Sequence, residues 1–318
     1  MAQTKTSCEL IFQQAEWEYR AAEGISQSEL KEILISPAHH QARYGPNAEP
    51  MFPTPAMQLG TAAHHKVLEP NSFDQHYVSK VESNGVPNIP ELKAIAKEQG
   101  IDIKGKTKKD DLVAAIYPDG VPKEKRKVLS EKDWLIVAGI HNAIQGHEVL
   151  APWFDASKPG YQKTNEVSIY ARDYLGITRK GRIDRLMIDE EAGVCRILDL
   201  KTTQSCDPHD FTGSMVRSKY HLQAFWYSDL VRRAMDAELL PQLEIEFYFV
   251  AVEKVLPYAL NVFRAPQQLI YEGSRLADRA LHTYAQCKEL EFWPGLDPVI
   301  HELKLPSWAT LRDEDAIG

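Results

Sequence analysis

The stretch GRIDRLMIDEEAGVCRILDLKTT, residues 181–203, decides the fold of this chain. Two runs rich in apolar and β-branched residues flank a polar turn at residues 189–193, and this pattern is typical of a β-hairpin. Because side chains alternate between the two faces of a strand, Asp199 and Lys201 point to the same side of the second strand. Asp184 lies on the first strand. In a suitable register, we expect two carboxylates and one ammonium group to meet at one end of a sheet.

Two carboxylates beside a lysine suit the hydrolysis of a phosphodiester. Carboxylate oxygens hold Mg²⁺, whose other positions are left to water and phosphate, and the ion lowers the pKa of a bound water. The lysine can position that water or offset negative charge. A D-x-K triplet is often only a solvated ion pair, but Asp199 lies in the apolar run 194–200, where an unpartnered carboxylate would be costly to bury. The residues therefore predict metal-dependent chemistry.

The composition is that of a soluble globular protein, with 43% hydrophobic and 26% charged residues in 318. No run approaches the roughly 18 apolar residues of a membrane helix, and no secretory signal is recognised, so we expect a cytoplasmic protein without a membrane partner. The four cysteines lack the spacing of a zinc ribbon or a disulfide framework. The net charge of −8 does not decide for or against nucleic acid, since residues 104–127 are locally basic.

Helical and strand patterns alternate along the rest of the chain, which indicates an α/β protein. Ser26 with Glu29, and Ser130, are placed to cap helices. Helical patterns cover residues 29–36, 57–68 (closed by Pro70), 131–150, 219–234 and 266–290, and strand patterns cover residues 166–201 and 244–254.

The motifs G-R-I-D and D-L-K-T-T, separated by the hairpin turn, resemble the core of the PD-(D/E)xK nuclease superfamily, with Asp in the second acidic position. Further segments resemble the RecE-type exonucleases (exodeoxyribonuclease VIII) of phages and prophages, in the RecB-like branch. The resemblance implies a restriction-endonuclease-like α/β core, with a mixed central sheet flanked by helices. The segments are ISQSEL with SPAHH (25–40), LGTAAHHKVLEP (59–70), YHLQAFWY (220–227), FVAVEK (249–254) and WPG with LPSWA (293–309).

The resemblance also implies roles for individual residues. The metal ligands would be Asp184, Asp199, the carbonyl of Leu200 and His64, which the G-x-x-x-H spacing favours over the adjacent His65. The catalytic set would be Lys201, Asp199, Asp184 and Glu166, although Glu166 alone reads equally well as a surface glutamate. Gln223 and Tyr227 stand four apart on one helical face and match a Q-x-x-x-Y element that contacts DNA, although that face alone would suit an ordinary half-buried helix. Arg182 would contact phosphate.

The function implied is processive 5′→3′ digestion of linear double-stranded DNA in a bacterial host cell. The 3′ single-stranded tails would serve recombination through a single-strand annealing protein. Such exonucleases form ring-shaped homo-oligomers and use Mg²⁺, for which Mn²⁺ can substitute. The alternative is a catalytically silent DNA-binding protein on a nuclease fold, against which the intact Asp, Asp and Lys argue. The iron–sulfur RecB-like group is excluded because its cysteine cluster is missing.

Residues 85–118 read as an insertion that divides the nuclease domain into residues 1–84 and 119–318. Two short helices, the second capped by Thr107, surround a hydrophilic turn in a helix–extended–helix pattern. This unit resembles the SAP and LEM-like modules that bind DNA or proteins, and a purely structural insertion is equally open. Its predicted core is Leu92, Ile95, Ile101, Leu112, Val113 and Ile116.

Overall fold

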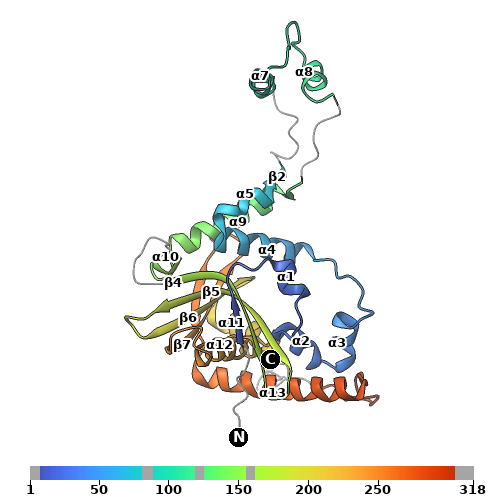
Figure 1. Cartoon of the computed structure of the whole chain (residues 1–318), viewed down its shortest axis with the longest axis vertical. Helices are drawn as coiled ribbons and strands as arrows, with labels where there is room; N and C mark the ends of the chain where they lie inside the picture. The colour runs from blue at the N-terminus through green and yellow to red at the C-terminus, as the bar shows by residue number, and fades with distance from the viewer. Residues whose placement is uncertain (1–7, 81–88, 119–124, 155–161, 305–318) are drawn as a thin grey trace, which may run out of the picture.

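A six-stranded sheet forms the centre of the molecule in the computed structural model, which describes residues 8–80, 89–118, 125–154 and 162–304 (Figure 1). Neighbouring strands are antiparallel except for β6 and β7, which are parallel. The mixed sheet flanked by helices that the sequence predicts is therefore confirmed. In order across the sheet the strands are β1 (Cys8–Ile11), β4 (Gln162–Arg172), β5 (Thr178–Asp189), β6 (Val194–Thr203), β7 (Glu244–Glu253) and β8 (Leu260–Arg264).

Helices cover both faces of the sheet, with α4 and α9 on one side and α12 and α13 on the other (Figure 1). β6 is buried on both faces, because Ile197 packs into the core beneath α12 while Leu198 and Leu200 pack into the core beneath α4 and α9. The face covered by α12 carries α2 (Gln27–Ile33), α3 (Pro37–Tyr44), α11 (Pro208–Arg217), α12 (Tyr220–Asp236) and α13 (Gln267–Leu290). The face covered by α4 carries α4 (Pro55–Leu68), α5 (Pro70–His76), α9 (Glu131–Gln145) and α10 (Ala151–Phe154).

The glycine of the G-R-I-D motif lets α12 lie close to β5. A Cβ atom at Gly181 would stand 2.5 Å from Cδ1 of Leu230 and 3.2 Å from Cδ1 of Tyr227. Both of those side chains belong to α12. A larger residue at this position would require the Leu230 and Tyr227 side chains, or α12 itself, to shift.

Helix capping follows the sequence in some places and departs from it in others. Ser26 and Glu29 form the predicted capping box, and Ser130 caps α9. The prediction that Thr107 caps the second helix of the insertion is wrong. The N-cap residue of α8 is Lys108, which makes no side-chain cap hydrogen bond. Pro70 begins α5 rather than only closing α4, since the first position of a helix needs no N–H donor.

The helix predicted over residues 131–150 is shorter in the structure, and a separate short helix, α10, follows it. α9 ends at Gln145, with Gly146 as its C-cap. The ring nitrogen Nδ1 of His147 then accepts hydrogen bonds from the N–H groups of Val149 and Leu150, just before α10 begins. This local turn satisfies donors that a continuous helix would have used.

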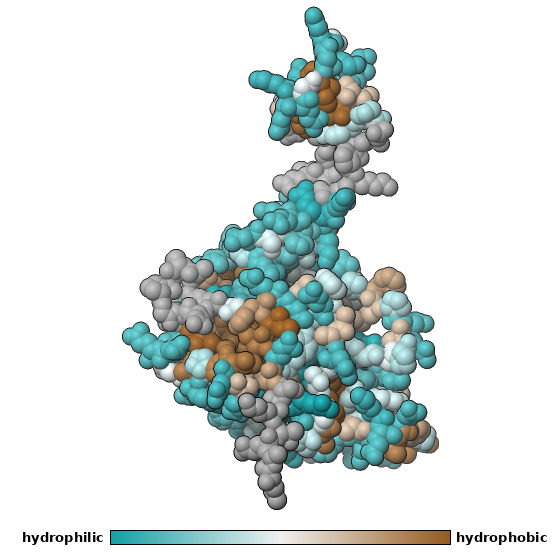
Figure 2. All heavy atoms as spheres, viewed as in Figure 1, coloured by the Kyte–Doolittle hydropathy of each residue, from teal (hydrophilic) through white to brown (hydrophobic). Residues whose placement is uncertain are grey.

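Residues 89–118 form a separate pair of helices, α7 (Ile89–Glu98) and α8 (Lys109–Ile116). Figure 2 shows hydrophobic residues between them and hydrophilic side chains around them. The chain leaves the main body after β2 (Tyr77–Ser79) and returns at β3 (Lys127–Leu129), and these two strands pair in parallel. The buried residues of the pair are Leu92, Ala96, Leu112 and Ile116, against which Ile95, Ile101 and Val113 are partly buried.

Within the described ranges, no helix is long and apolar enough to cross a bilayer.

Candidate active site

Three acidic residues line up across three neighbouring strands. The register of β4 and β5 pairs the residues on either side of Glu166 with those on either side of Asp184, so these two lie opposite each other. The pairing of β5 with β6 ends at Arg185 and Leu198, one step before Asp184 would meet Asp199. The regular pairing of β5 with β6 therefore ends just before the positions of Asp184 and Asp199.

Glu166 adopts a backbone conformation that is unusual in a strand. Its φ of 53° lies in the left-handed region, and it is left out of the ladder that its neighbours form. Such strained residues are concentrated at functional sites. The carboxylate of Glu166 pairs with Nε of Arg182 at 2.9 Å. Burial and the nearby Asp184 nevertheless raise the pKa of Glu166 to about 8, so the site crowds negative charge that Arg182 only partly offsets.

The Asp184 side chain connects β5 to β6 beyond the end of their regular pairing. Its Oδ2 accepts a hydrogen bond of 2.8 Å from the backbone N–H of Leu200. The same oxygen lies 3.6 Å from Nδ1 of His64 on α4. Asp184 therefore joins the middle of the sheet to the helix above it.

Asp199 and Lys201 form a buried ion pair on the side of β6 that meets α12. Asp199 is 1% exposed, and its Oδ2 lies 2.5 Å from Nζ of Lys201. The side-chain amide of Gln223 donates a hydrogen bond of 2.5 Å to the other oxygen. The Lys201 ammonium also lies 4.9 Å from the ring centroid of Tyr220.

Burial and the neighbouring charges shift the pKa of both members of this ion pair. Burial raises the pKa of Asp199 to about 6 even though the Lys201 ammonium lowers it, whereas Asp199 and Asp184 raise the pKa of Lys201 against the opposing effect of burial. The contacts indicate that both groups are charged, because the Lys201 ammonium and the Gln223 amide both point donors toward the Asp199 carboxylate. We take the carboxylate as ionised and Lys201 as charged.

Lys31 is a neighbour of this pair that the sequence did not single out. Its ammonium lies 5.4 Å from the same Tyr220 ring that Lys201 approaches. Burial and the positive charge of Lys201 lower the pKa of Lys31 to about 7, against the attraction of Asp199. Lys31 directly follows the ISQSEL segment, but no local pattern indicates that α2 presents it to β6.

A cavity of about 1030 Å³ opens beside Asp184 and Glu166. Arg182, His64 and Tyr227 also line it, whereas Asp199 and Lys201 do not. Residues of the N-terminal helix α1 (Glu16–Ala21) and of α4 complete its walls.

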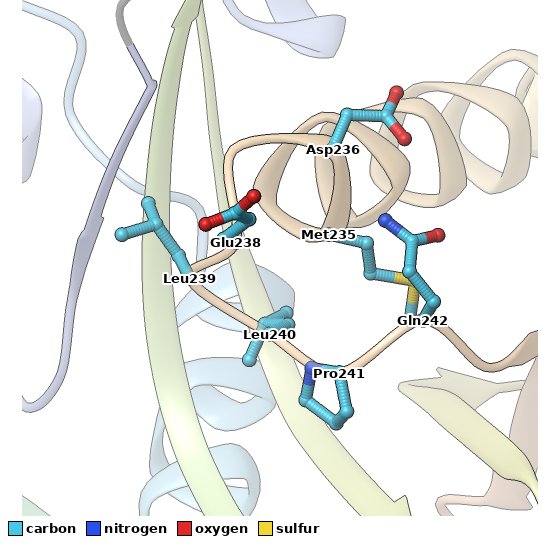
Figure 3. A pocket seen from close by; sticks show the side chains of 7 residues that line it. All are labelled: Met235, Asp236, Glu238, Leu239, Leu240, Pro241 and Gln242. Carbon is cyan, nitrogen blue, oxygen red and sulfur yellow. The ribbon is translucent and has the colours of Figure 1, made fainter.

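A second cavity of about 630 Å³ lies where α12 leads toward β7 and contains none of the predicted site residues (Figure 3). The carboxylates of Asp236 and Glu238 point away from each other there. Without convergent polar groups, this hollow is not a candidate active site.

The predicted residues thus fall into two connected groups. Glu166, Asp184, His64, Arg182 and Tyr227 share the cavity, while Asp199, Lys201 and Gln223 contact one another beneath α12. The hydrogen bond from the N–H of Leu200 to Asp184 connects the groups.

Two residues predicted to contact DNA have protein partners. The guanidinium of Arg182 binds Glu166 and also donates to the carbonyl oxygen of Gln14 at 3.2 Å. Gln223 is 4% exposed and binds Asp199. Contact with DNA through either residue stays a prediction, and both have a direct role in holding an acidic side chain in place.

The donor set fits a hard divalent cation bound through a small number of protein ligands. In the part of the chain that the structure describes, no three His, Cys, Asp or Glu side chains converge to hold a metal by themselves. Mg²⁺ is commonly held by one or two carboxylates and keeps several waters. Asp184 with Asp199 is the pair that we predict. Burial and the nearby Asp184 raise the pKa values of Glu166 and Asp199, so a bound cation would stabilise the charged forms of these carboxylates.

Residues 26–297 match a family described as a PDDEXK-like domain of unknown function (DUF3799). The match covers most of the chain, which therefore belongs to this family. Membership in the PD-(D/E)xK superfamily is confirmed, and it supports a nuclease. The finer resemblance to RecE-type exonucleases stays a prediction.

One solved structure has the same fold. A crystal structure described as "Putative exonuclease" from Eubacterium rectale aligns with a TM-score of 0.52 and 14% identity, covering 92% of this chain and 96% of that one. At this identity the similarity shows the fold alone. Protein VC1899 from Vibrio cholerae aligns with a TM-score of only 0.20 and 11% identity, over 87% of this chain and 59% of that one, which supports no argument. No curated protein matches the chain.

Proposed function

We propose that this chain is a divalent-metal-dependent DNA exonuclease whose reaction is centred on Asp184, Asp199 and Lys201. The observation that carries the proposal is that the regular pairing of β5 with β6 ends just before Asp184 and Asp199, beside a lysine that is held by an ion pair. A buried carboxylate with a charged partner is expensive to maintain for stability alone. A site that binds a cation and a phosphodiester accounts for it.

Each side chain has a distinct part in the proposed reaction. Asp184 and Asp199 would hold Mg²⁺ or Mn²⁺, with the Leu200 carbonyl and His64 as the further ligands that we predict. When bound, the ion supplies charge neutralisation and an acidified water. Lys201 is oriented by Asp199 and Tyr220, so that its ammonium can offset negative charge on the scissile phosphate.

The neighbouring residues support this arrangement. Gln223 fixes the orientation of the Asp199 carboxylate. Arg182 holds Glu166, whose negative charge would add to that of Asp184 at the cation site. Tyr227 lines the cavity and lies one helical turn after Gln223, so it is placed to meet DNA that enters there.

We extend the proposal to the substrate and its biology on the resemblance of the sequence to RecE-type enzymes. The substrate would be linear double-stranded DNA, digested processively in the 5′→3′ direction by a ring-shaped oligomer in the cytoplasm of a bacterial host cell. The 3′ tails would pass to a single-strand annealing protein. The pair α7 and α8 would help to engage DNA or this partner.

The decisive experiment uses linear duplexes labelled at one 5′ end or at one 3′ end, with blocked-end and circular controls. We expect mononucleotide release from the 5′ end in Mg²⁺ or Mn²⁺ and none in EDTA. Release from the 3′ end would reverse the polarity, and cleavage of the circle would indicate an endonuclease. Binding of DNA without hydrolysis in any divalent metal would favour the alternative, a catalytically silent DNA-binding protein.

A further inference from the structure

The segment that precedes the family match forms part of the cavity wall. The match begins at residue 26, whereas residues 13–17 and Arg20 line the cavity together with Asp184 and Glu166. This segment contains the turn after β1 and the short helix α1. It therefore adds a surface to the candidate site that the matched family region does not provide.

Trp17 on this segment has an unusual environment for tryptophan. It is 71% exposed, while the other four tryptophans among the described residues are buried or half-buried. Met57, at the start of α4, lines the same cavity and is 44% exposed. Two large apolar side chains thus remain accessible in a cavity that Asp184 and Glu166 also line.

The backbone that presents Trp17 is firmly attached to the sheet. The side-chain oxygen of Gln14 accepts a hydrogen bond of 2.9 Å from the hydroxyl of Tyr170, and its carbonyl accepts one from Arg182. After the helix, the ammonium of Lys180 donates to the carbonyl of Ala22 at 2.7 Å. Contacts at both ends of α1 hold it in place, so Trp17 is a fixed platform rather than part of a loose tail.

Arg182 connects this platform directly to the site. The same guanidinium that binds the Gln14 carbonyl also pairs with Glu166. The position of α1 is therefore coupled to an acidic side chain that lies opposite Asp184 on the sheet.

The charges in the cavity give a polyanion little attraction. Arg20 pairs with Glu16 at 2.6 Å, and Arg182 pairs with Glu166. The lining residues with charged side chains, histidines aside, are Arg20, Lys127 and Arg182 against Glu16, Glu69, Glu166 and Asp184. Without a bound cation, the side chains of this wall therefore offer phosphate little net charge, and an apolar contact would add to the attachment of DNA.

We propose that Trp17 is a stacking platform for an unpaired nucleobase of the DNA whose phosphodiester lies at Asp184, with Met57 as a second apolar contact. The proposal rests on the nuclease function proposed above. Every base has a π-face, so stacking on tryptophan attaches a strand without regard to sequence. A strand held in this way must be unpaired at that nucleotide, so the substrate is a frayed or single-stranded end.

Binding without hydrolysis provides the test. The dissociation constant is measured in EDTA by fluorescence anisotropy for a duplex with a four-nucleotide unpaired end, and for a series in which each unpaired nucleotide in turn is abasic. The proteins are the wild type, Trp17→Ala, Trp17→Phe and Met57→Ala. Tyr271→Ala is the matched control, because Tyr271 is 62% exposed on α13 and outside the cavity lining.

At one abasic position we expect wild-type binding to weaken by about tenfold or more. Trp17→Ala should lose about as much on the intact DNA and nothing further on the abasic DNA. Trp17→Phe and Met57→Ala should lose less, and Tyr271→Ala should behave like the wild type. The proposal is overturned if, at every position, an abasic nucleotide changes the dissociation constant of Trp17→Ala by the same factor as that of the wild type.

Hydrolysis of the intact duplex in Mg²⁺, measured in parallel, separates the two claims. Base-dependent binding through Trp17 without hydrolysis leaves the stacking platform standing and removes the nuclease function. Hydrolysis with binding that is indifferent to Trp17 does the reverse. Circular dichroism melting of Trp17→Ala checks that the fold is retained, which we expect because the side chain is exposed.

Discussion

The middle of the sheet and the pair α7–α8 differ in how much buried apolar surface each has to offset the cost of burying charged groups. Around β4, β5 and β6, a large core surrounds an ion pair, a strained glutamate and a carboxylate that connects two strands. The pair α7–α8 has a core of four buried residues, all of them apolar. Burying charge costs stability, so only the region with extensive apolar burial can maintain it. The difference indicates that the chemistry belongs to the sheet, whatever α7 and α8 bind.

Removal of one lysine from each region tests whether hydrolysis depends on the sheet and not on the pair α7–α8, and it has the largest expected effect. Lys201→Ala removes the ammonium beside Asp199, and we expect a loss of hydrolysis of about 100-fold or more, because a preorganised charge near the phosphate disappears. Lys93→Ala on the exposed face of α7 should leave hydrolysis unchanged. Both are measured as kcat/KM on labelled duplex in Mg²⁺, with anisotropy to confirm that DNA still binds. Normal turnover in Lys201→Ala would remove the site assignment.

A smaller effect is expected when the side chain that positions Asp199 is shortened. Gln223→Ala removes the amide that donates to this carboxylate, and partners of this kind typically contribute about 10- to 100-fold to metal affinity or activity. We expect the variant to need a higher Mg²⁺ concentration for half of its maximal hydrolysis rate, measured by titrating Mg²⁺ in the activity assay. Gln268→Ala, on the exposed start of α13, is the control. A Gln223→Ala variant with an unchanged titration would show that the hydrogen bond is only structural.

Deletion of residues 85–118 should have a weaker effect on chemistry than on binding. β2 and β3 are parallel, so the chain must cross back from the end of β2 to the start of β3, and residues 80–84 and 119–126, which the deletion keeps, can serve as that connection. We expect metal-dependent cleavage of short duplexes to persist while the affinity for long DNA or for the annealing partner decreases. A variant with Lys106→Ala and Lys108→Ala, which keeps the helices, tests whether exposed charge is responsible through the salt dependence of binding. Wild-type behaviour of the deletion would reduce the unit to a structural insertion.

The smallest expected effect is a pH-dependent change in stability at Glu166. Its pKa is about 8 in the fold against 4.5 as the ordinary value. Between these values the folded protein binds more protons than the unfolded chain, so the contribution of Glu166 to stability, present below about 4.5, is lost as the pH rises through about 8. In EDTA, the Tm of Glu166→Gln minus that of the wild type should therefore become more positive from about pH 5 to about pH 9.

The control for loss of one negative charge is Glu289→Gln at the exposed end of α13. A Tm difference for Glu166→Gln that does not vary with pH would contradict the crowding of Glu166 and Asp184. A divalent cation at the site should reduce the difference, because it offsets the same repulsion.

Local patterns were sufficient for much of the fold. The run of apolar and β-branched residues around Asp199 predicts a strand, in which alternating side chains put Asp199 and Lys201 on one side, and the structure has this strand. The capping box at Ser26 and the glycine at 193 mark a helix start and a hairpin turn, because each depends only on residues a few positions away. The end of α9 at Gln145 is not predicted, since the glycine at 146 alone does not require a helix to end.

The sequence by itself determined the two carboxylates and the lysine, the hairpin that carries them and the superfamily to which they belong. The tertiary structure decided which groups meet them. Lys31 above Tyr220, the Gln223 amide on Asp199 and the Arg182 link from Glu166 to Gln14 all join positions far apart in the chain. Such contacts depend on the register of strands and the packing of helices on them, which local periodicity does not specify.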